Sequence, residues 1–243
     1  MRLAAIACRV FTRELSAAVA VCPHPVEVSW LPQGLHDTPD TLRERIGQTI
    51  GAIERADAEA PARRRFDAIV LCYGLCGGGL DGVRAGRLPL VVPRADDCIG
   101  VLLGSQERYL DYLGARAGIY WYTPGWIEYA DTPSRVYYDA KLRDYTARFG
   151  ADNARWLLEQ ENAWIDTYES SVYIAPPACP DGAFEAFARD AARTYGWRFE
   201  TAAGSAGWLA ALLSGNWDAR RFAVCPPGEV LSRSYDPAIF RPF

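Results

Sequence analysis

The sequence predicts an α/β protein made of two Rossmann-like halves, each with a largely parallel sheet, and an interdomain cleft between them. Short apolar runs alternate with longer amphipathic segments along the chain, which is the pattern of βα units. The pattern of the first part returns in a weaker form after residue 171. A single unbroken sheet is the alternative.

The first part of the chain carries the clearest elements. Apolar runs predict strands over residues 3–8, 26–31, 67–72, 90–92 and 118–122. A helix is predicted after the capping residues Asp37 and Asp40, because apolar residues recur at helical spacing from Leu42 to Ile53 and charged residues fill the other face. A second helix is expected over residues 99–113.

The remaining elements suggest three regions: an N-terminal α/β half (1–125) that carries the cysteine site, a helical connection (126–170) and a C-terminal α/β half (171–243). The connection is rich in Tyr, Trp and charge, with helices expected over 141–149 and 153–167 and a break at Gly150. The C-terminal half is expected to form a second β-α-β-α-β unit, whose last strand begins at Phe222.

The composition limits the class of protein. The 243 residues carry a net charge of -4, which gives no sign of a protein that binds nucleic acid or a membrane surface. No apolar stretch approaches the ~20 residues that a bilayer requires, and the N-terminus lacks a secretory signal. We therefore expect a cytoplasmic protein, in which seven cysteines serve packing or metal binding rather than structural disulfides.

Three of these cysteines follow strand-like runs. Cys8 ends the first run, Cys76 lies in a glycine-rich turn after the third, and Cys98 follows the fourth. The carboxyl ends of parallel strands meet at one edge of a sheet, where ligands bind in open α/β folds. We therefore predict a thiolate metal site. Three ligands with one open position suit catalytic zinc, and equally an iron–sulfur cluster with one free iron.

The residues around Cys98 have two interpretations. Asp96 and Asp97 are suited to cap the following helix, and either could also be a fourth ligand or orient one. The helix N-terminus and nearby Arg94 should lower the pKa of Cys98 and make it a ready thiolate. His36, after the second strand, could reach the same cleft or could simply begin the next helix.

Further residues are candidates for binding a substrate. Arg94 would bind its anionic part, and Gly77 and Gly78 allow close approach of the backbone. Trp126 lies in an aromatic segment that lines a substrate pocket or forms a hydrophobic hinge, together with Glu128. The other cysteines have no comparable setting: Cys22, Cys72, Cys179 and Cys225.

Several segments together resemble a known family: residues 33–37, the turn around Cys76, residues 93–99, residues 103–105 and residues 123–126. They are similar to the uncharacterised domain-of-unknown-function family numbered 1638, over most of the chain. Some of its bacterial and archaeal members occur alongside corrinoid-dependent methyltransferases, which implies a link to methyl transfer or one-carbon metabolism. In the family the position of Asp96 is often His, and a carboxylate there favours harder metals or a supporting role.

The leading hypothesis is a metal-binding protein with zinc or an iron–sulfur cluster at three cysteines and a small-molecule substrate. As an enzyme it would be a metal-dependent transferase or lyase, and its partner a corrinoid methyltransferase system. The alternative is a non-enzymatic, two-lobed binding module for a small anionic metabolite or cofactor. A thiol enzyme that uses Cys98 or Cys76 as nucleophile is a third reading.

Overall fold

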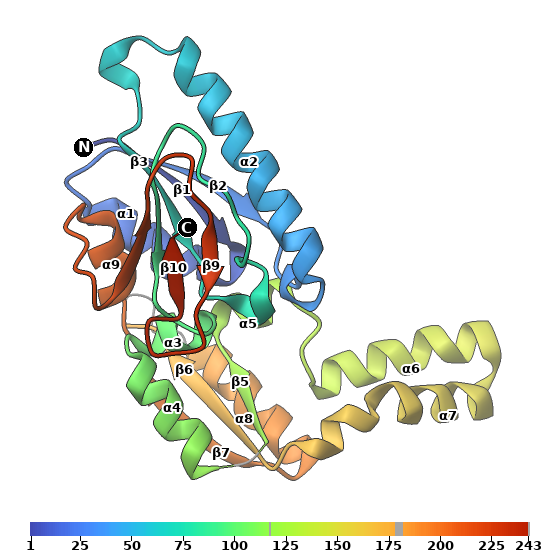
Figure 1. The fold of residues 1–243 in the computed structure, drawn as a ribbon. Coiled ribbons are helices and arrows are strands. Elements are labelled where there is room, and N and C mark those ends of the chain that lie inside the picture. The colour runs from blue at the N-terminus through green and yellow to red at the C-terminus, as the bar shows by residue number, and fades with distance from the viewer. Residues whose placement is uncertain (117, 178–181, 243) are drawn as a thin grey trace.

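The computed structural model describes residues 1–116, 118–177 and 182–242, and it confirms the α/β class. In this part of the chain the strands form a five-stranded sheet, a three-stranded sheet and a two-stranded ribbon (Figure 1). Parallel pairing dominates both larger sheets. None of the described helices combines the length and apolar character that a bilayer-spanning segment needs.

The five-stranded sheet has the order β2-β1-β3-β4-β8. Its parallel strands are β2 (Val26–Leu31), β1 (Leu3–Cys8), β3 (Ala68–Cys72) and β4 (Leu90–Pro93), and β8 (Phe222–Cys225) pairs antiparallel with β4. The inner strands β1 and β3 are buried on both faces, which explains their almost continuous apolar sequence. The strands expected over residues 3–8 and 26–31 are confirmed.

Successive residues of β1 face opposite sides of this sheet. Leu3, Ala5 and Ala7 belong to an apolar layer with α1 (Thr12–Val21) and α9 (Gly207–Leu213). Ala4 and Ile6 belong to the opposite layer with α2 (Pro39–Glu59). The buried face of α2 carries Leu42, Ile46 and Ile50, as its periodicity predicts.

The three-stranded sheet is parallel, with β6 (Ser170–Ala175) between β5 (Ile119–Tyr122) and β7 (Arg198–Ala203). One face packs on α8 (Gly182–Tyr195). The other face, through Val172 and Ile174, joins the apolar layer that also holds α1 and α9. A continuous core therefore connects the two sheets.

The helix expected over residues 99–113 is two helices, α3 (Cys98–Leu103) and α4 (Gln106–Ala115). Gly104 ends α3 in a left-handed conformation, with φ of 76°. Ser105 then caps α4, because its Oγ accepts a hydrogen bond from the N–H of Arg108 at 3.1 Å. Gly104 therefore ends one helix and Ser105 begins the next, although the apolar pattern of the sequence continues across both residues.

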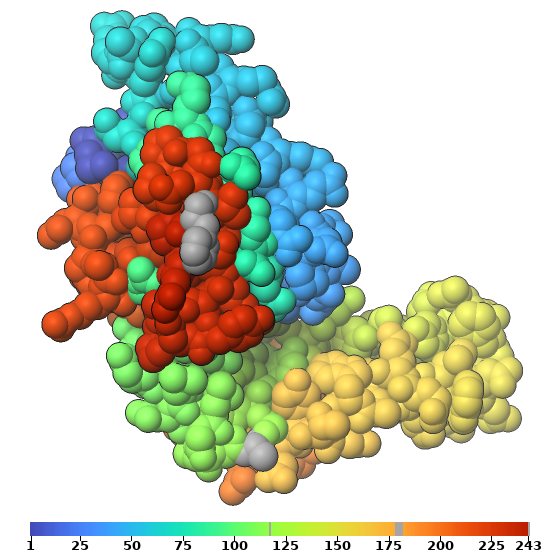
Figure 2. All heavy atoms as spheres, in the orientation of Figure 1, coloured from blue at the N-terminus to red at the C-terminus, as the bar shows by residue number. Residues whose placement is uncertain are grey.

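The connection begins with α5 (Pro124–Tyr129) and continues as a hairpin of α6 (Arg135–Phe149) and α7 (Ala151–Asn162). The hairpin projects from the rest of the molecule (Figures 1 and 2). It turns at Gly150, as expected, but α6 starts earlier than predicted, and the end of the second predicted helix is a 3-10 turn over Ala163–Thr167. Other 3-10 turns lie at Arg9–Phe11, Leu35–Asp37, Ala62–Arg64 and Cys76–Gly78.

The sheets do not follow the division expected at residues 125 and 171. The strand β5 was expected with the N-terminal strands but pairs with β6, and β8 was expected with β6 and β7 but pairs with β4. The ribbon of β9 (Leu231–Arg233) and β10 (Phe240–Pro242) packs beside β8. An apolar run in the sequence predicts a strand but does not predict which strand it pairs with. Strand β8 pairs with backbone groups of β4 that would otherwise be exposed at the edge of the sheet.

Candidate functional site

A pocket of about 240 Å³ lies where β1, β3 and β4 end. Its lining includes the thiols of Cys8, Cys76 and Cys98, which the sequence places after these three strands. Trp121 of β5 and Trp126 of α5 also line it. Elements from both larger sheets therefore contribute to one pocket.

Cys76 sits in a tightly constrained turn. Its φ is 47°, an uncommon value for a residue other than glycine, and Gly77 and Gly78 follow with φ of 66° and 94°. The N–H of Cys76 donates to the carbonyl of Asp96 at 2.9 Å, so this turn is tied to the loop after β4. Just before it, Gly74 is required, because a Cβ there would lie 2.6 Å from the Cα of Asp97.

Cys98 is the first residue of α3, and Asp97 caps that helix as predicted. The Asp97 Oδ1 accepts hydrogen bonds from the N–H groups of Ile99 and Gly100 at 2.8 and 3.3 Å. Its Oδ2 accepts from the hydroxyl of Tyr109 at 2.6 Å. Both carboxylate oxygens are therefore used in holding the loop that carries Cys98.

In the absence of a cation, burial disfavours the thiolate form of all three cysteines. Burial raises the pKa of Cys8 to about 11. Burial, and then the carboxylate of Asp97, raise the pKa of both Cys76 and Cys98. The expected low pKa of Cys98 is therefore wrong, because desolvation outweighs the short helix α3 and Arg94 points elsewhere.

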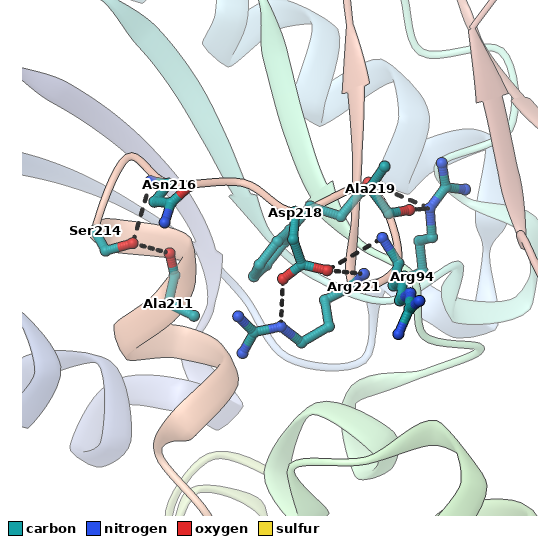
Figure 3. Close-up of polar contacts among 9 residues, drawn as sticks. Arg94, Ala211, Ser214, Asn216, Asp218, Ala219 and Arg221 are labelled. Atoms are coloured by element: carbon teal, nitrogen blue, oxygen red, sulfur yellow. Dashed lines mark hydrogen bonds and ion pairs between the residues drawn. The ribbon is translucent and has the colours of Figure 1, made fainter.

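Arg94 does not line the pocket. Its Nε donates to the carbonyls of Ala219 and Phe222 at 2.9 and 3.2 Å, next to the pair of Asp218 and Arg221 (Figure 3). Its Nη1 donates to the carbonyls of Phe240, at 2.6 Å, and Ala238. The guanidinium thus fastens the C-terminal segment to the sheet instead of meeting a ligand in this pocket.

Asp96 also lies away from the pocket. Its Oδ2 accepts from the side-chain amide of Gln106 at 2.6 Å, and its N–H donates to the Gln106 Oε1 at 3.1 Å. Asp96 and Arg94 instead line a second, wider cavity of about 830 Å³.

Of the other residues predicted to bind a substrate or a metal, some line the pocket and some lie outside it. Gly77, Trp126 and His36 line the pocket, and the rings of His36 and Trp126 meet edge to face with centroids 6.1 Å apart. Gly78 is outside the pocket lining. Glu128 is also outside it and pairs with Arg13, whose Nε lies 3.0 Å from the Glu128 Oε2.

Sequence reasoning gave no role to Tyr73, which lines the pocket directly after β3. A polar aromatic residue just past a buried strand, beside a glycine-rich turn, is the signal that could have found it. Trp121 was expected only as a member of an aromatic segment. It packs on Tyr112 with ring centroids 5.3 Å apart, which connects the pocket wall to α4.

The thiols share the pocket without a preformed coordination geometry. Among the described residues, no group of three or more His, Cys, Asp or Glu side chains is arranged to hold a metal ion. Cys22, Cys72 and Cys225 lie outside this pocket, and Cys179 lies outside the described residues.

A family model described as "Protein of unknown function (DUF1638)" matches residues 30–213. This segment contains the loops of Cys76 and Cys98 and the residues Trp121 and Trp126, and it begins after Cys8. No curated protein and no solved structure matches the chain.

Proposed function

The chain belongs to the DUF1638 family, whose function is unknown, so we propose a function from the pocket itself: it binds a metal ion or iron–sulfur cluster through Cys8, Cys76 and Cys98. The bound group would act on a small molecule in the same pocket, as in a metal-dependent transferase or lyase. Two Rossmann-like halves with a cleft at this pocket are part of the proposal.

The observation that carries the proposal is the set of acidic groups that line the pocket. Three thiols and the carboxyl of Asp97 line it, and its lining contains no Lys or Arg in the described part of the chain. Ionised together, these groups would repel one another, and a cation would offset that repulsion. Thiolates are the usual ligands of structural zinc and of iron–sulfur clusters, so the donor set fits either group.

The neighbouring residues limit the fourth ligand. Asp97 is held by three hydrogen bonds, so it positions the loop of Cys98. Asp96 is bonded to Gln106, away from the pocket. His36 also lines the pocket and is the remaining candidate for a fourth ligand, and a fourth position open to substrate is the other arrangement.

The pocket is smaller than the roughly 300–1,000 Å³ that drug-sized ligands occupy, which favours a small substrate. Trp121 and Trp126 would exclude water from it, and Gly77 would let a substrate approach the backbone. Zinc would supply a Lewis acid that activates a thiol or other nucleophile, as methyl transfer requires, whereas a cluster would offer an open iron to a hydroxyl or carboxylate. A link to a corrinoid methyltransferase system belongs to this proposal as its metabolic setting.

Elemental analysis of protein purified without oxygen tests the metal site. We expect zinc, or iron with sulfide and a brown colour, in the wild type. Cys98→Ser should lose most of the metal because it removes one of three ligands. Cys22→Ser is the matched control, since Cys22 lies outside the pocket, and it should keep the metal. Full metal content in Cys98→Ser would end the proposal.

The raised pKa values of the thiols and the apolar walls favour a second candidate, a metal-free binding module. In that case the protonated thiols are part of an apolar lining for a small organic ligand. Arg94 is unavailable to bind an anion there, so an uncharged ligand suits this reading. Thermal stabilisation by small organic molecules, unchanged after chelation, would support the module over the metal site.

A further inference from the structure

Tyr73 lines the pocket, and its buried hydroxyl has no hydrogen-bond partner among the described residues. The residue is 3% exposed and lines the pocket beside Cys76. Its Oη is buried and has no partner among the described residues. Buried hydroxyls are normally paired, so an unpaired one in a residue that lines a pocket points to a ligand atom as the missing partner.

Other buried tyrosines of this protein do not share this property. The Tyr122 hydroxyl donates to the carbonyl of Pro133 at 2.6 Å, and the Tyr109 hydroxyl donates to Asp97 at 2.6 Å. Both are supplied with an acceptor by the fold. The hydroxyls of Ser170 and Ser171 are also buried without a partner, but neither residue lines this pocket. Among the described residues that line the pocket, Tyr73 is therefore the one with an unpaired buried hydroxyl.

The surroundings of Tyr73 determine the kind of ligand atom. A phenol hydroxyl keeps its proton at neutral pH, so the hydroxyl of Tyr73 is available as a donor. A donor needs an acceptor, and oxygen is a far better acceptor than sulfur. The absence of Lys and Arg from the lining argues against a multiply charged anion such as phosphate.

We propose that Tyr73 donates its hydroxyl hydrogen bond to a carbonyl-type oxygen of a small carboxylate whose apolar part lies against Trp121 and Trp126. The inference rests on the proposed metal site for one point, because the bound cation would balance the charge of the carboxylate. The hydrogen bond itself does not need the metal. An uncharged amide of the same size therefore serves as the probe in metal-free protein.

Tyr73→Phe separates ligand binding from stability, with Tyr122→Phe as the matched control. Tyr73→Phe removes a hydroxyl that the fold does not use, so the melting temperature of the metal-free protein should stay unchanged or rise. Tyr122→Phe leaves a buried carbonyl unpaired and should lower the melting temperature by about 2–4 °C. Equal losses in the two variants would show that Tyr73 has a structural partner and would overturn the inference.

Binding is measured by titration calorimetry with propanoate and propanamide, on zinc-loaded and on metal-free protein. We expect propanoate to prefer the loaded protein, and Tyr73→Phe to weaken whichever probe binds by about tenfold, which corresponds to about 1.4 kcal/mol. Tyr122→Phe should bind like the wild type. Unchanged affinity in Tyr73→Phe, or no binding of either probe to the wild type, would refute the inference. Failure of zinc to bind would instead refute the proposed function.

Discussion

Replacing Asp97 by Ala should destabilise the loop that carries Cys98, and the cost can be worked out from its hydrogen bonds. Loss of the helix cap removes the acceptor of the Ile99 and Gly100 N–H groups, which typically costs about 1 kcal/mol. The hydroxyl of Tyr109, which is 9% exposed as a residue, would lose its acceptor, at a cost of roughly 1–3 kcal/mol. The free energy of unfolding should fall by about 2–4 kcal/mol in total.

Thermal unfolding of the metal-free protein measures this loss. For a chain of this length each kcal/mol lowers the melting temperature by about 2–4 °C. Asp97→Asn is the milder control, because its single amide oxygen keeps the helix cap, while its NH2 group can donate to the Tyr109 oxygen in place of the lost acceptor. In a double-mutant cycle, Tyr109→Phe should recover part of the loss caused by Asp97→Ala, since it removes the unpaired hydroxyl. Strictly additive effects, or equal losses in the Ala and Asn variants, would refute the reasoning.

Three more changes have defined outcomes. Burial raises the pKa of Glu14 in the folded protein above its value in the unfolded chain. The protonated carboxyl is tolerated at low pH, and the folded state loses stability as the pH rises through the interval between these two pKa values. Glu14→Gln should therefore be more stable than the wild type at pH 7 and nearly equal at pH 4 in chemical denaturation, and a pH-independent difference would contradict this. Arg94→Ala removes hydrogen bonds to carbonyls of the C-terminal segment, so backbone hydrogen exchange in that segment should become faster. Arg94→Lys should restore slow exchange only poorly, because an ammonium group lacks the planar set of donors of a guanidinium. Gly74→Ala should destabilise by placing a Cβ against the backbone of Asp97, whereas Gly47→Ala, in open space within α2, should stabilise by up to about 1 kcal/mol; similar melting temperatures would refute the comparison.

Local patterns predicted the elements that depend on neighbouring residues. The periodicity from Leu42 to Ile53 located α2, and the apolar runs located β1 and β2, because each signal lies within the element itself. The convergence of Cys8, Cys76 and Cys98 could also be anticipated, since the carboxyl ends of parallel strands share an edge.

Features set by distant residues could not be predicted in this way. The partners of Arg94 are carbonyls that follow it by more than a hundred positions, so the sequence around Arg94 says nothing of its direction. The pKa of Cys98 depends on burial created by both sheets, which outweighs the local effect of a helix terminus. The unpaired hydroxyl of Tyr73 could not be predicted from the sequence either, because it depends on which acceptor groups the folded chain places around it.

The antiparallel strand β8 has a consequence for the order in which the chain folds. During synthesis β4 emerges with residues 90–93, but its outer neighbour arrives only with residues 222–225. Until then the apolar strand β4 lies at the edge of the sheet in place of β8, and its unpaired backbone groups invite pairing with other chains. All strands of the three-stranded sheet are synthesised between β4 and β8. A ribosome-bound chain can therefore complete the three-stranded sheet before the five-stranded sheet receives β8. Chains truncated before Phe222 should therefore aggregate even though the strands around the cysteine pocket are all present.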